Sequence, residues 1–289
     1  MVILNTGHLF RLVEDEAIEV IDLKLCNLFG GYHHISLPAK KLNDDLFKRG
    51  IGVDSSSIPG FKTAGVSDMS LLPDPSTSVI DPFGERRTLT LLGSLIDAET
   101  GEPFRLDPRY IVQRAENYMI ETGIADRSQW GPEFEFYIFE AVHINNRINE
   151  AYYNIESAEA GWHNQDFSDD DDSSLIPRKG GYHVTPPRDR YFNLRDRMSA
   201  VIEQYGIPVK YHHHEVGGSG QSEIEIELLP ALQACDAVMA VKYIAKNLAR
   251  QAGYSVTFMP KPLYNEAGSG MHFHQHLFNG DTPLFYDGT

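Results

Sequence analysis

Carboxylates alternate with aromatic residues in the stretch Gly131–Phe139, which reads Gly-Pro-Glu-Phe-Glu-Phe-Tyr-Ile-Phe. Aromatic and branched residues favour a strand, and the two-residue period of a strand puts Glu133 and Glu135 on one face and Phe134 and Phe136 on the other. Two adjacent carboxylates repel each other, so a cation must compensate them or one must bind a proton. Mg²⁺ or Mn²⁺ suits such an oxygen-rich site. The alternative is that this strand turns a polar face to solvent.

A second group of chemically active residues surrounds a glycine-rich bend. Three histidines, His212–His214, precede Glu215, and the bend separates Glu215 from Glu223. Glycines let the backbone turn tightly, so we expect the two carboxylates to return to one small volume. Adjacent strand residues point to opposite faces, so we expect only His213 to share a face with Glu215. For residues 223–227, an amphipathic strand with a solvated face is the alternative.

Two more histidines, His272 and His274, follow a Gly-Ser-Gly sequence that begins at Gly268. They share a face if residues 271–276 form a strand, and the glycines allow a ligand to approach the backbone. By contrast, we interpret the four consecutive aspartates at 169–172 as part of a solvated polar loop and assign them no site.

The elements that position these residues fall into two predicted domains. Residues 1–103 form a small β-rich domain with a hairpin from about Ile18 to Leu37 and strands near 78–80 and 88–96. A polar linker over 99–105 leads to a helix with Asp107 as its cap and Pro108 in its first turn. The second domain, residues 104–289, is predicted to add helices over 189–206 and 231–252 and a strand over 255–259.

Composition narrows the classes of function. A chain of 289 residues with 42% hydrophobic residues is long and apolar enough to bury a core. Its 25 basic and 41 acidic residues give a net charge of −16, which argues against nucleic acid or an anionic membrane as a partner. Cys26 and Cys235 are too far apart in sequence for a zinc motif and suggest no disulfide framework, so we predict a reducing, cytoplasmic location. No signal-peptide pattern or membrane-spanning apolar run is present.

The ordered motifs resemble the glutamine synthetase family, bacterial type I. The matching stretches are Asp54-Ser-Ser-Ser-Ile58, Asp74-Pro-Ser-Thr77, Asp81-Pro-Phe83, Gly131-Pro-Glu-Phe-Glu135, Lys179-Gly-Gly-Tyr182, His213-His-Glu-Val216, Gly220-Gln-Ser-Glu223, Phe258-Met-Pro-Lys-Pro262 and Gly268-Ser-Gly-Met-His272. The resemblance covers nearly the whole chain. It implies an α+β protein, in which a β-grasp-like N-terminal domain precedes a catalytic domain with a curved antiparallel sheet, here incomplete.

The resemblance implies ATP-dependent ligation of ammonia to L-glutamate through a γ-glutamyl phosphate, with two or more Mg²⁺ or Mn²⁺ ions per site. Glu135, Glu215 and Glu223 would surround the metal beside glutamate and ammonium. Glu133 and His272 would hold the metal at the ATP phosphates.

Further roles are implied by the same resemblance. Asp54 would be catalytic across a subunit boundary, in a homo-oligomer of stacked rings with active sites between subunits. The substrate-binding residues would be His213 and Gly268, and the nucleotide-binding residues would be Lys210, His274 and His276.

Several positions depart from the family pattern, namely Ser55, Phe61, Leu228, Ala267 and His276. Of these, Ser55, Phe61 and Ala267 motivate one alternative, a γ-glutamyl ligase that uses an amine or polyamine. A non-catalytic homologue is a second alternative. Family members also continue beyond the residue that matches Thr289, with a further glutamate ligand, phosphate-binding arginines and a flap. We therefore expect these 289 residues alone to be inactive and poorly folded.

Overall fold

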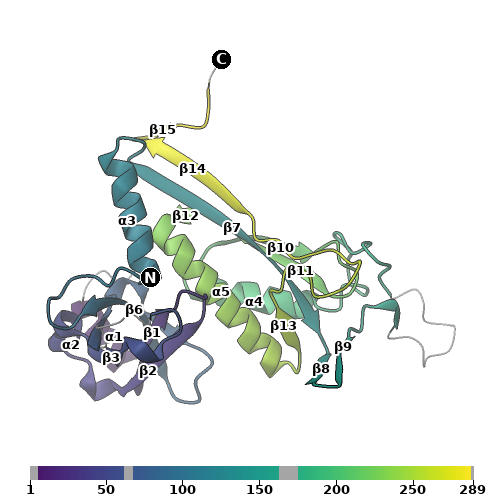
Figure 1. Cartoon of the computed structure of the whole chain (residues 1–289), viewed down its shortest axis with the longest axis horizontal. Coiled ribbons are helices and arrows are strands. Elements are labelled where there is room, and N and C mark those ends of the chain that lie inside the picture. Colours follow the sequence, from purple (N-terminus) through teal and green to yellow (C-terminus); the bar gives the residue numbers. More distant parts are fainter. Residues whose placement is uncertain (1–5, 62–67, 163–174, 288–289) are drawn as a thin grey trace. The chain divides into compact units, whose positions relative to one another are not determined.

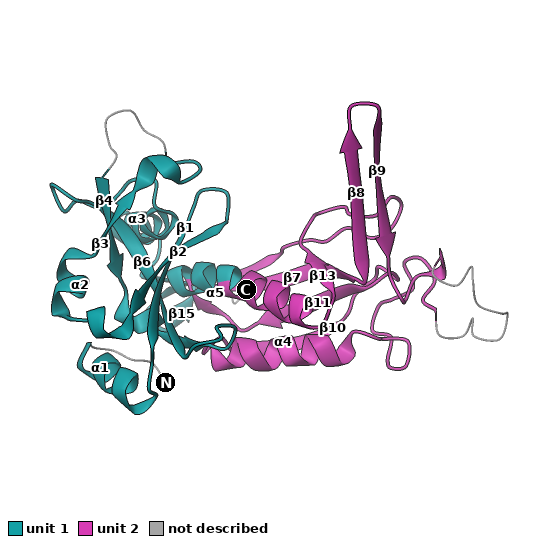
Figure 2. Cartoon of the chain, turned by 90° about the horizontal axis from the view of Figure 1, so that it is seen from below, with its two compact units in different colours: residues 1–128, 231–239, 277–289 teal, residues 129–230, 240–276 magenta. Residues whose placement is uncertain are grey.

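The computed structural model describes residues 6–61, 68–162 and 175–287. The chain forms two compact units, which Figure 2 distinguishes by colour. The first contains residues 1–128, 231–239 and 277–289, and the second contains residues 129–230 and 240–276. The aspartates at 169–172 lie outside the described residues.

A mixed sheet forms the centre of the first unit. Its strand order is β2-β1-β6-β4-β3, with β5 also paired to β6. The strands are β1 (Val20–Cys26), β2 (Tyr32–Pro38), β3 (Ile51–Asp54), β4 (Asp68–Pro73), β5 (Val79–Asp81) and β6 (Thr88–Asp97). The predicted hairpin is confirmed, since β1 and β2 pair antiparallel from Val20↔Pro38 to Cys26↔Tyr32. The pairing of β1 with β6 is parallel.

Helices complete this unit. They are α1 (Thr6–Asp15), which was not predicted, α2 (Asp44–Arg49) and α3 (Pro108–Glu121). The predicted cap of α3 is confirmed: Asp107 accepts hydrogen bonds from the backbone N–H groups of Arg109 at 3.0 Å and Leu95 at 2.9 Å. The apolar core includes Leu9 of α1, Leu23 of β1, Leu71 of β4 and Leu91 of β6, all fully buried.

The second sheet is built around the long strand β7 (Arg127–Phe139), which confirms the predicted strand and extends it towards the N-terminus. Its strand order is β10-β11-β7-β14-β15, and β12 and β13 also pair with β7 (Figure 1). The other strands are β10 (Val209–His214), β11 (Gln221–Ile226), β12 (Leu229–Pro230), β13 (Ser255–Thr257), β14 (Phe273–Asn279) and β15 (Thr282–Pro283). The antiparallel partner of β7 on one side is β11.

Alternation along β7 sorts its side chains as predicted. Phe134 and Phe136 are buried, whereas Glu133 and Glu135 are partly exposed on the other face. The helix α5 (Ala231–Gln251) confirms the predicted helix, and its buried residues include Val241, Ile244 and Leu248. The sheet therefore has one apolar, covered face and one face free for carboxylates.

Two parts of this unit differ from expectation. The helix α4 (Phe192–Gln204) begins three residues after Asp189, because the Asp189 carboxylate forms a buried ion pair with Arg195 at 2.6 Å and residues 188 and 189 form a turn back to Thr185. The hairpin of β8 (Ala141–Arg147) and β9 (Glu150–Glu156) was not predicted and projects from the rest of its unit (Figure 2). Among the described residues, no helix is both long and apolar enough to cross a membrane.

Candidate active site

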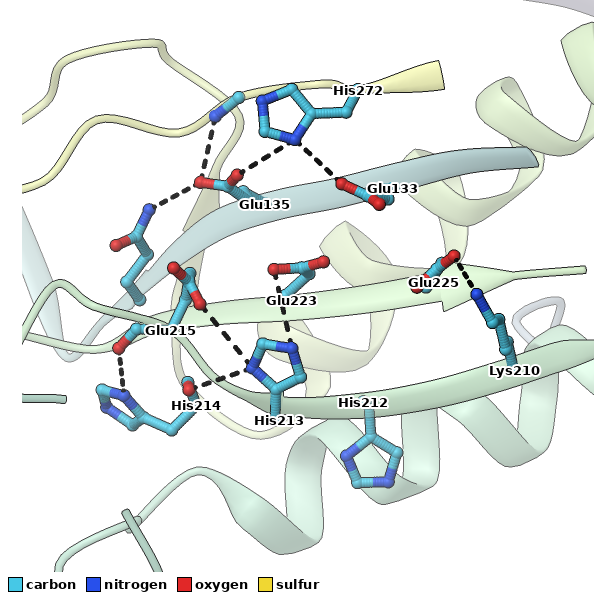
Figure 3. A network of polar contacts seen from close by, with 12 residues as sticks. Glu133, Glu135, Lys210, His212, His213, His214, Glu215, Glu223, Glu225 and His272 are labelled. Atoms are coloured by element: carbon cyan, nitrogen blue, oxygen red, sulfur yellow. Dashed lines mark hydrogen bonds and ion pairs between the residues drawn. The ribbon is translucent and has the colours of Figure 1, made fainter. Parts of the chain in front are cut away.

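Strand register brings the predicted carboxylates together on one face of the second sheet (Figure 3). Glu135 lies directly opposite Glu223, and Glu133 lies directly opposite Glu225. Glu223 and Glu225 are only 9% and 2% exposed, so a solvated face for this strand was the wrong alternative. The physical reason is that β11 lies inside the sheet, between β10 and β7. Four carboxylates are thereby held within a small, largely water-excluded area.

Each carboxylate oxygen of Glu133 contacts a different histidine. His272 Nδ1 lies 2.8 Å from Glu133 Oε2, and His274 Nε2 lies 2.6 Å from Glu133 Oε1. The two histidines share a face, as the sequence predicted. Burial opposes ionisation of Glu133, but the hydrogen bonds from His274 and His272 outweigh it and lower its pKa. The hydrogen bond to Glu133 also raises the pKa of His272.

Glu135 is fixed by neutral donors. Its Oε2 accepts hydrogen bonds from Gln221 Nε2 at 3.0 Å and from the Gly270 backbone N–H at 3.1 Å. A Cβ at Gly270 would lie 3.0 Å from Glu135 Oε1 and 2.9 Å from His272 Nε2, so a side chain here would require these groups to shift. Gln221 also donates to the carbonyl of Gly268 at 2.9 Å, which ties this loop to the sheet.

A second cluster consists of His213, Glu215 and Glu223, whose donor atoms lie within 4.8 Å of one another. His213 is 3.7 Å from a carboxylate oxygen of each glutamate. Burial raises the pKa of Glu215, and burial together with the charges of Glu215, Glu133 and Glu135 raises the pKa of Glu223 to about 7. Burial and the neighbouring negative charges disfavour the ionised form of these carboxylates, and a bound divalent cation would favour it.

The three consecutive histidines have separate environments, as expected from strand alternation. Only His213 lies between the carboxylates. On the opposite face, His212 Nδ1 accepts a hydrogen bond from Arg195 Nε at 3.2 Å. His214 is fully buried, with Nε2 at 2.9 Å from Glu159 Oε2 and Nδ1 at 2.7 Å from the carbonyl oxygen of Glu215. Because His214 contacts both Glu159 and the Glu215 carbonyl, this buried pair fixes the main chain at Glu215.

The remaining predicted residues lie around these clusters or apart from them. Lys210 Nζ contacts Glu225 Oε1 at 2.7 Å. His276 is exposed and, by alternation along β14, lies on the same face as His274. Asp54 belongs to the first unit, where it is exposed and accepts hydrogen bonds from Ser56 Oγ at 2.6 Å and Ser57 Oγ at 3.0 Å, which lower its pKa.

The sequence analysis missed two residues of this site. Glu225 was placed in the predicted strand but given no role, although the alternation Glu-Ile-Glu from Glu223 already put it on the same face. Gln221 was part of a matching motif, but its contact with Glu135 depends on the register between β11 and β7. Local sequence does not contain that register.

The donor set fits divalent cations. Glu215 Oε2 is buried and has no hydrogen-bond partner in the part of the chain that the structure describes. Buried charged oxygens without partners are costly, and a bound cation removes that cost. The residues able to hold such ions are Glu133, Glu135, His213, Glu215, Glu223, Glu225, His272 and His274.

A carboxylate-rich face on an antiparallel sheet is the candidate site of this chain, and comparisons with known proteins identify the family. Residues 17–98 match the glutamine synthetase β-Grasp domain, and residues 105–289 match the glutamine synthetase catalytic domain. The glutamine synthetase of Mycolicibacterium smegmatis is 43% identical over 288 residues, which is 98% of this chain and 60% of that protein. The Frankia alni glutamine synthetase is 41% identical over 277 residues, 96% of this chain and 58% of that protein.

A solved structure agrees with these matches. The cryoEM structure of Plasmodium falciparum glutamine synthetase matches with a TM-score of 0.91 and 27% identity, covering 100% of this chain and 57% of that chain. This chain therefore belongs to the glutamine synthetase family, and its predicted α+β fold is confirmed. It spans about 60% of the length of the curated relatives that it matches.

Proposed function

We propose that the protein carrying this chain is an ATP-dependent glutamate–ammonia ligase that makes L-glutamine through a γ-glutamyl phosphate. The observation that supports this most is the pairing of Glu135 with Glu223 and of Glu133 with Glu225, beside Glu215 and two histidines. Phosphoryl transfer to a carboxylate gathers negative charge, and carboxylate-bound metals compensate it. The glutamine synthetase relatives support the same chemistry.

Within this proposal, Glu135, Glu215 and Glu223 hold the cation beside glutamate, and Glu133 and His272 hold the cation at the ATP phosphates. Mg²⁺ or Mn²⁺ in these positions would neutralise phosphate charge during transfer. Gln221 and the Gly270 N–H keep Glu135 oriented, and the buried His214–Glu159 pair keeps the Glu215 backbone in place. The protein's own part is thus to position carboxylates before the substrates arrive.

Other assignments in the proposal concern substrates. His213 and Gly268 contact glutamate, and Lys210, His274 and His276 contact the nucleotide. Asp54 acts on the ammonium site of a neighbouring subunit in a ring-shaped homo-oligomer. Its two serine donors favour the ionised carboxylate, which is the form that can bind ammonium and accept a proton. The domain boundary between residues 103 and 104 also stands as a proposal.

The test is glutamine formation by the protein as produced from its gene, with ATP, L-glutamate, ammonium and Mg²⁺ or Mn²⁺. We expect equal amounts of glutamine and ADP, and loss of both in Glu135→Gln. Exposed Glu227→Gln, one residue beyond the end of β11, serves as the matched control and should retain activity. Product with putrescine but not with ammonium would instead support the amine ligase, and metal binding without ATP consumption would support a non-catalytic homologue.

A further inference from the structure

We propose that Arg195 is a positioning residue for the cluster of His213, Glu215 and Glu223, which it reaches from the covered face of the sheet. It joins β10 and β11 at the point where these strands carry His213 and Glu223. This inference rests on the proposed function and deepens it, because it names the side chain that sets the spacing of donors at the position assigned to the cation beside glutamate. Arg195 belongs to α4 and is only 1% exposed.

The guanidinium group of Arg195 contacts three side chains of the second unit. Nη1 and Nη2 donate to the two carboxylate oxygens of Asp189 at 3.2 Å and 2.6 Å, which makes a bidentate ion pair. Nη1 also donates to Ser222 Oγ on β11 at 3.2 Å, and Nε donates to His212 Nδ1 on β10 at 3.2 Å. Because Asp189 already balances the charge of the guanidinium group, the contacts with Ser222 and His212 fix the two strands rather than compensate the carboxylate row.

Strand register shows why these two contacts affect the cluster. His213 lies directly opposite Glu223 in the antiparallel pairing of β10 and β11. His212 and Ser222 each immediately precede one member of that pair, and alternation directs their side chains to the other face of the sheet. Figure 3 shows His212 directed away from the carboxylate row. Arg195 therefore links the two strands diagonally, directly behind the His213–Glu223 pair.

The apolar core does not secure the end of β11 beside the glycine-rich bend. Ile224 and Ile226, which are 0% and 1% exposed, secure the rest of the strand. Residues 217–222 read Gly-Gly-Ser-Gly-Gln-Ser and contain no large apolar side chain that could pack in the core. Taking an ion pair out of water is costly, and apolar residues of similar size often stabilise a fold as well or better. The buried Arg195–Asp189 pair therefore indicates a positioning role at this end of the strand.

The competing explanation is that Arg195 only anchors α4 to the sheet. This helix has apolar anchors of its own, since Met198 and Ile202 are fully buried. The variant Arg195→Lys separates the two explanations, because lysine retains a charge for Asp189 but lacks the rigid set of donors that reaches both strands. A positioning role predicts a loss at one cation position, whereas an anchoring role predicts the same effect on every cation position or none.

Mn²⁺ binding is the measurement that distinguishes these roles. Free Mn²⁺ is measured by electron paramagnetic resonance during titration of the protein as produced from its gene. Wild type is compared with Arg195→Lys and with Arg197→Lys, a matched control at an exposed arginine of the same helix. Glu215→Gln identifies the binding class that depends on the cluster. We expect Arg195→Lys to weaken that class about tenfold, to leave the class that depends on Glu133 unchanged, and Arg197→Lys to match wild type.

Ser222→Ala is a second variant, which removes only the contact with β11 and leaves the ion pair of Arg195 intact. We expect it to weaken the same Mn²⁺ class by a smaller factor, and it decides the question alone if Arg195→Lys does not fold. Unchanged binding in the folded variants, or an equal loss in both Mn²⁺ classes, would overturn the inference and leave Arg195 as an anchor of the fold. These titrations need no turnover, so the proposed function is tested separately by glutamine formation.

Discussion

Glu223 allows a direct test of whether the carboxylates that would bind cations lower the stability of the metal-free protein. Burial, and then the charges of Glu215, Glu133 and Glu135, raise its pKa to about 7 from an ordinary value of 4.5. One pKa unit corresponds to about 1.4 kcal/mol, so ionising Glu223 costs the folded, metal-free protein on the order of 3 kcal/mol. Glutamine has the same shape without the charge. Glu223→Gln should therefore stabilise the metal-free protein at high pH.

The sign of the pH dependence follows from proton binding. Between about pH 4.5 and pH 7 the folded protein holds the Glu223 proton more tightly than the unfolded chain does. The stability that Glu223 contributes is fully present below about pH 4.5, and it is lost as the pH rises through about 7. The advantage of Glu223→Gln should thus approach about 3 kcal/mol near pH 8 and vanish near pH 4.5.

The assay is unfolding in EDTA and in Mn²⁺ at several pH values, with Glu227→Gln as the control. A cation at about 100 times its dissociation constant adds about 2.7 kcal/mol to the stability of the protein that binds it. In EDTA near pH 8 we expect Glu223→Gln to be more stable than wild type, and in Mn²⁺ we expect its advantage to disappear. If Glu223→Gln is less stable in EDTA and gains as much from Mn²⁺ as wild type, the carboxylate is neither strained by its neighbours nor a ligand.

Two further predictions concern the groups that support the carboxylates. Glu159→Ala leaves buried His214 without its charged partner, so we expect a loss of about 3 to 5 kcal/mol in urea unfolding; a loss below about 1 kcal/mol would contradict a structural pair. Gly270→Ala places a methyl group 3.0 Å from Glu135 Oε1, so we expect Mn²⁺ affinity about tenfold weaker by calorimetry with little change in stability. Unchanged affinity would show that the loop moves aside freely.

Strand periodicity made part of this site predictable. The alternation of Glu133 and Glu135 with Phe134 and Phe136 was sufficient to predict β7 and the sharing of a face by its two carboxylates. The same rule separated His213 from its neighbours, because adjacent strand residues point to opposite faces. These inferences need only the local chain.

Non-local pairing was not predictable in this way. Whether Glu223 or Glu225 faces Glu135 depends on how β11 aligns with β7. The alternative of a solvated strand for residues 223–227 stayed open because the sequence does not show that β11 pairs on both edges. The start of α4 shows the same limit: Asp189 is used in an ion pair with Arg195 rather than in the helix. Each case turns on a contact between segments distant in sequence or on a buried charge.

The apolar face of the sheet also fixes the geometry of the charged face. Phe134, Phe136, Ile224 and Ile226 are buried at the positions that alternate with the four glutamates of β7 and β11. A slip of one residue in either strand would bury carboxylates in the core and expose phenylalanine or isoleucine, so the hydrophobic effect opposes it strongly. The core thus holds together carboxylates whose mutual repulsion would otherwise separate them. Cation binding, by removing that repulsion, should then stabilise the whole sheet rather than one loop, and metal affinity and folding stability should change together when this register is disturbed.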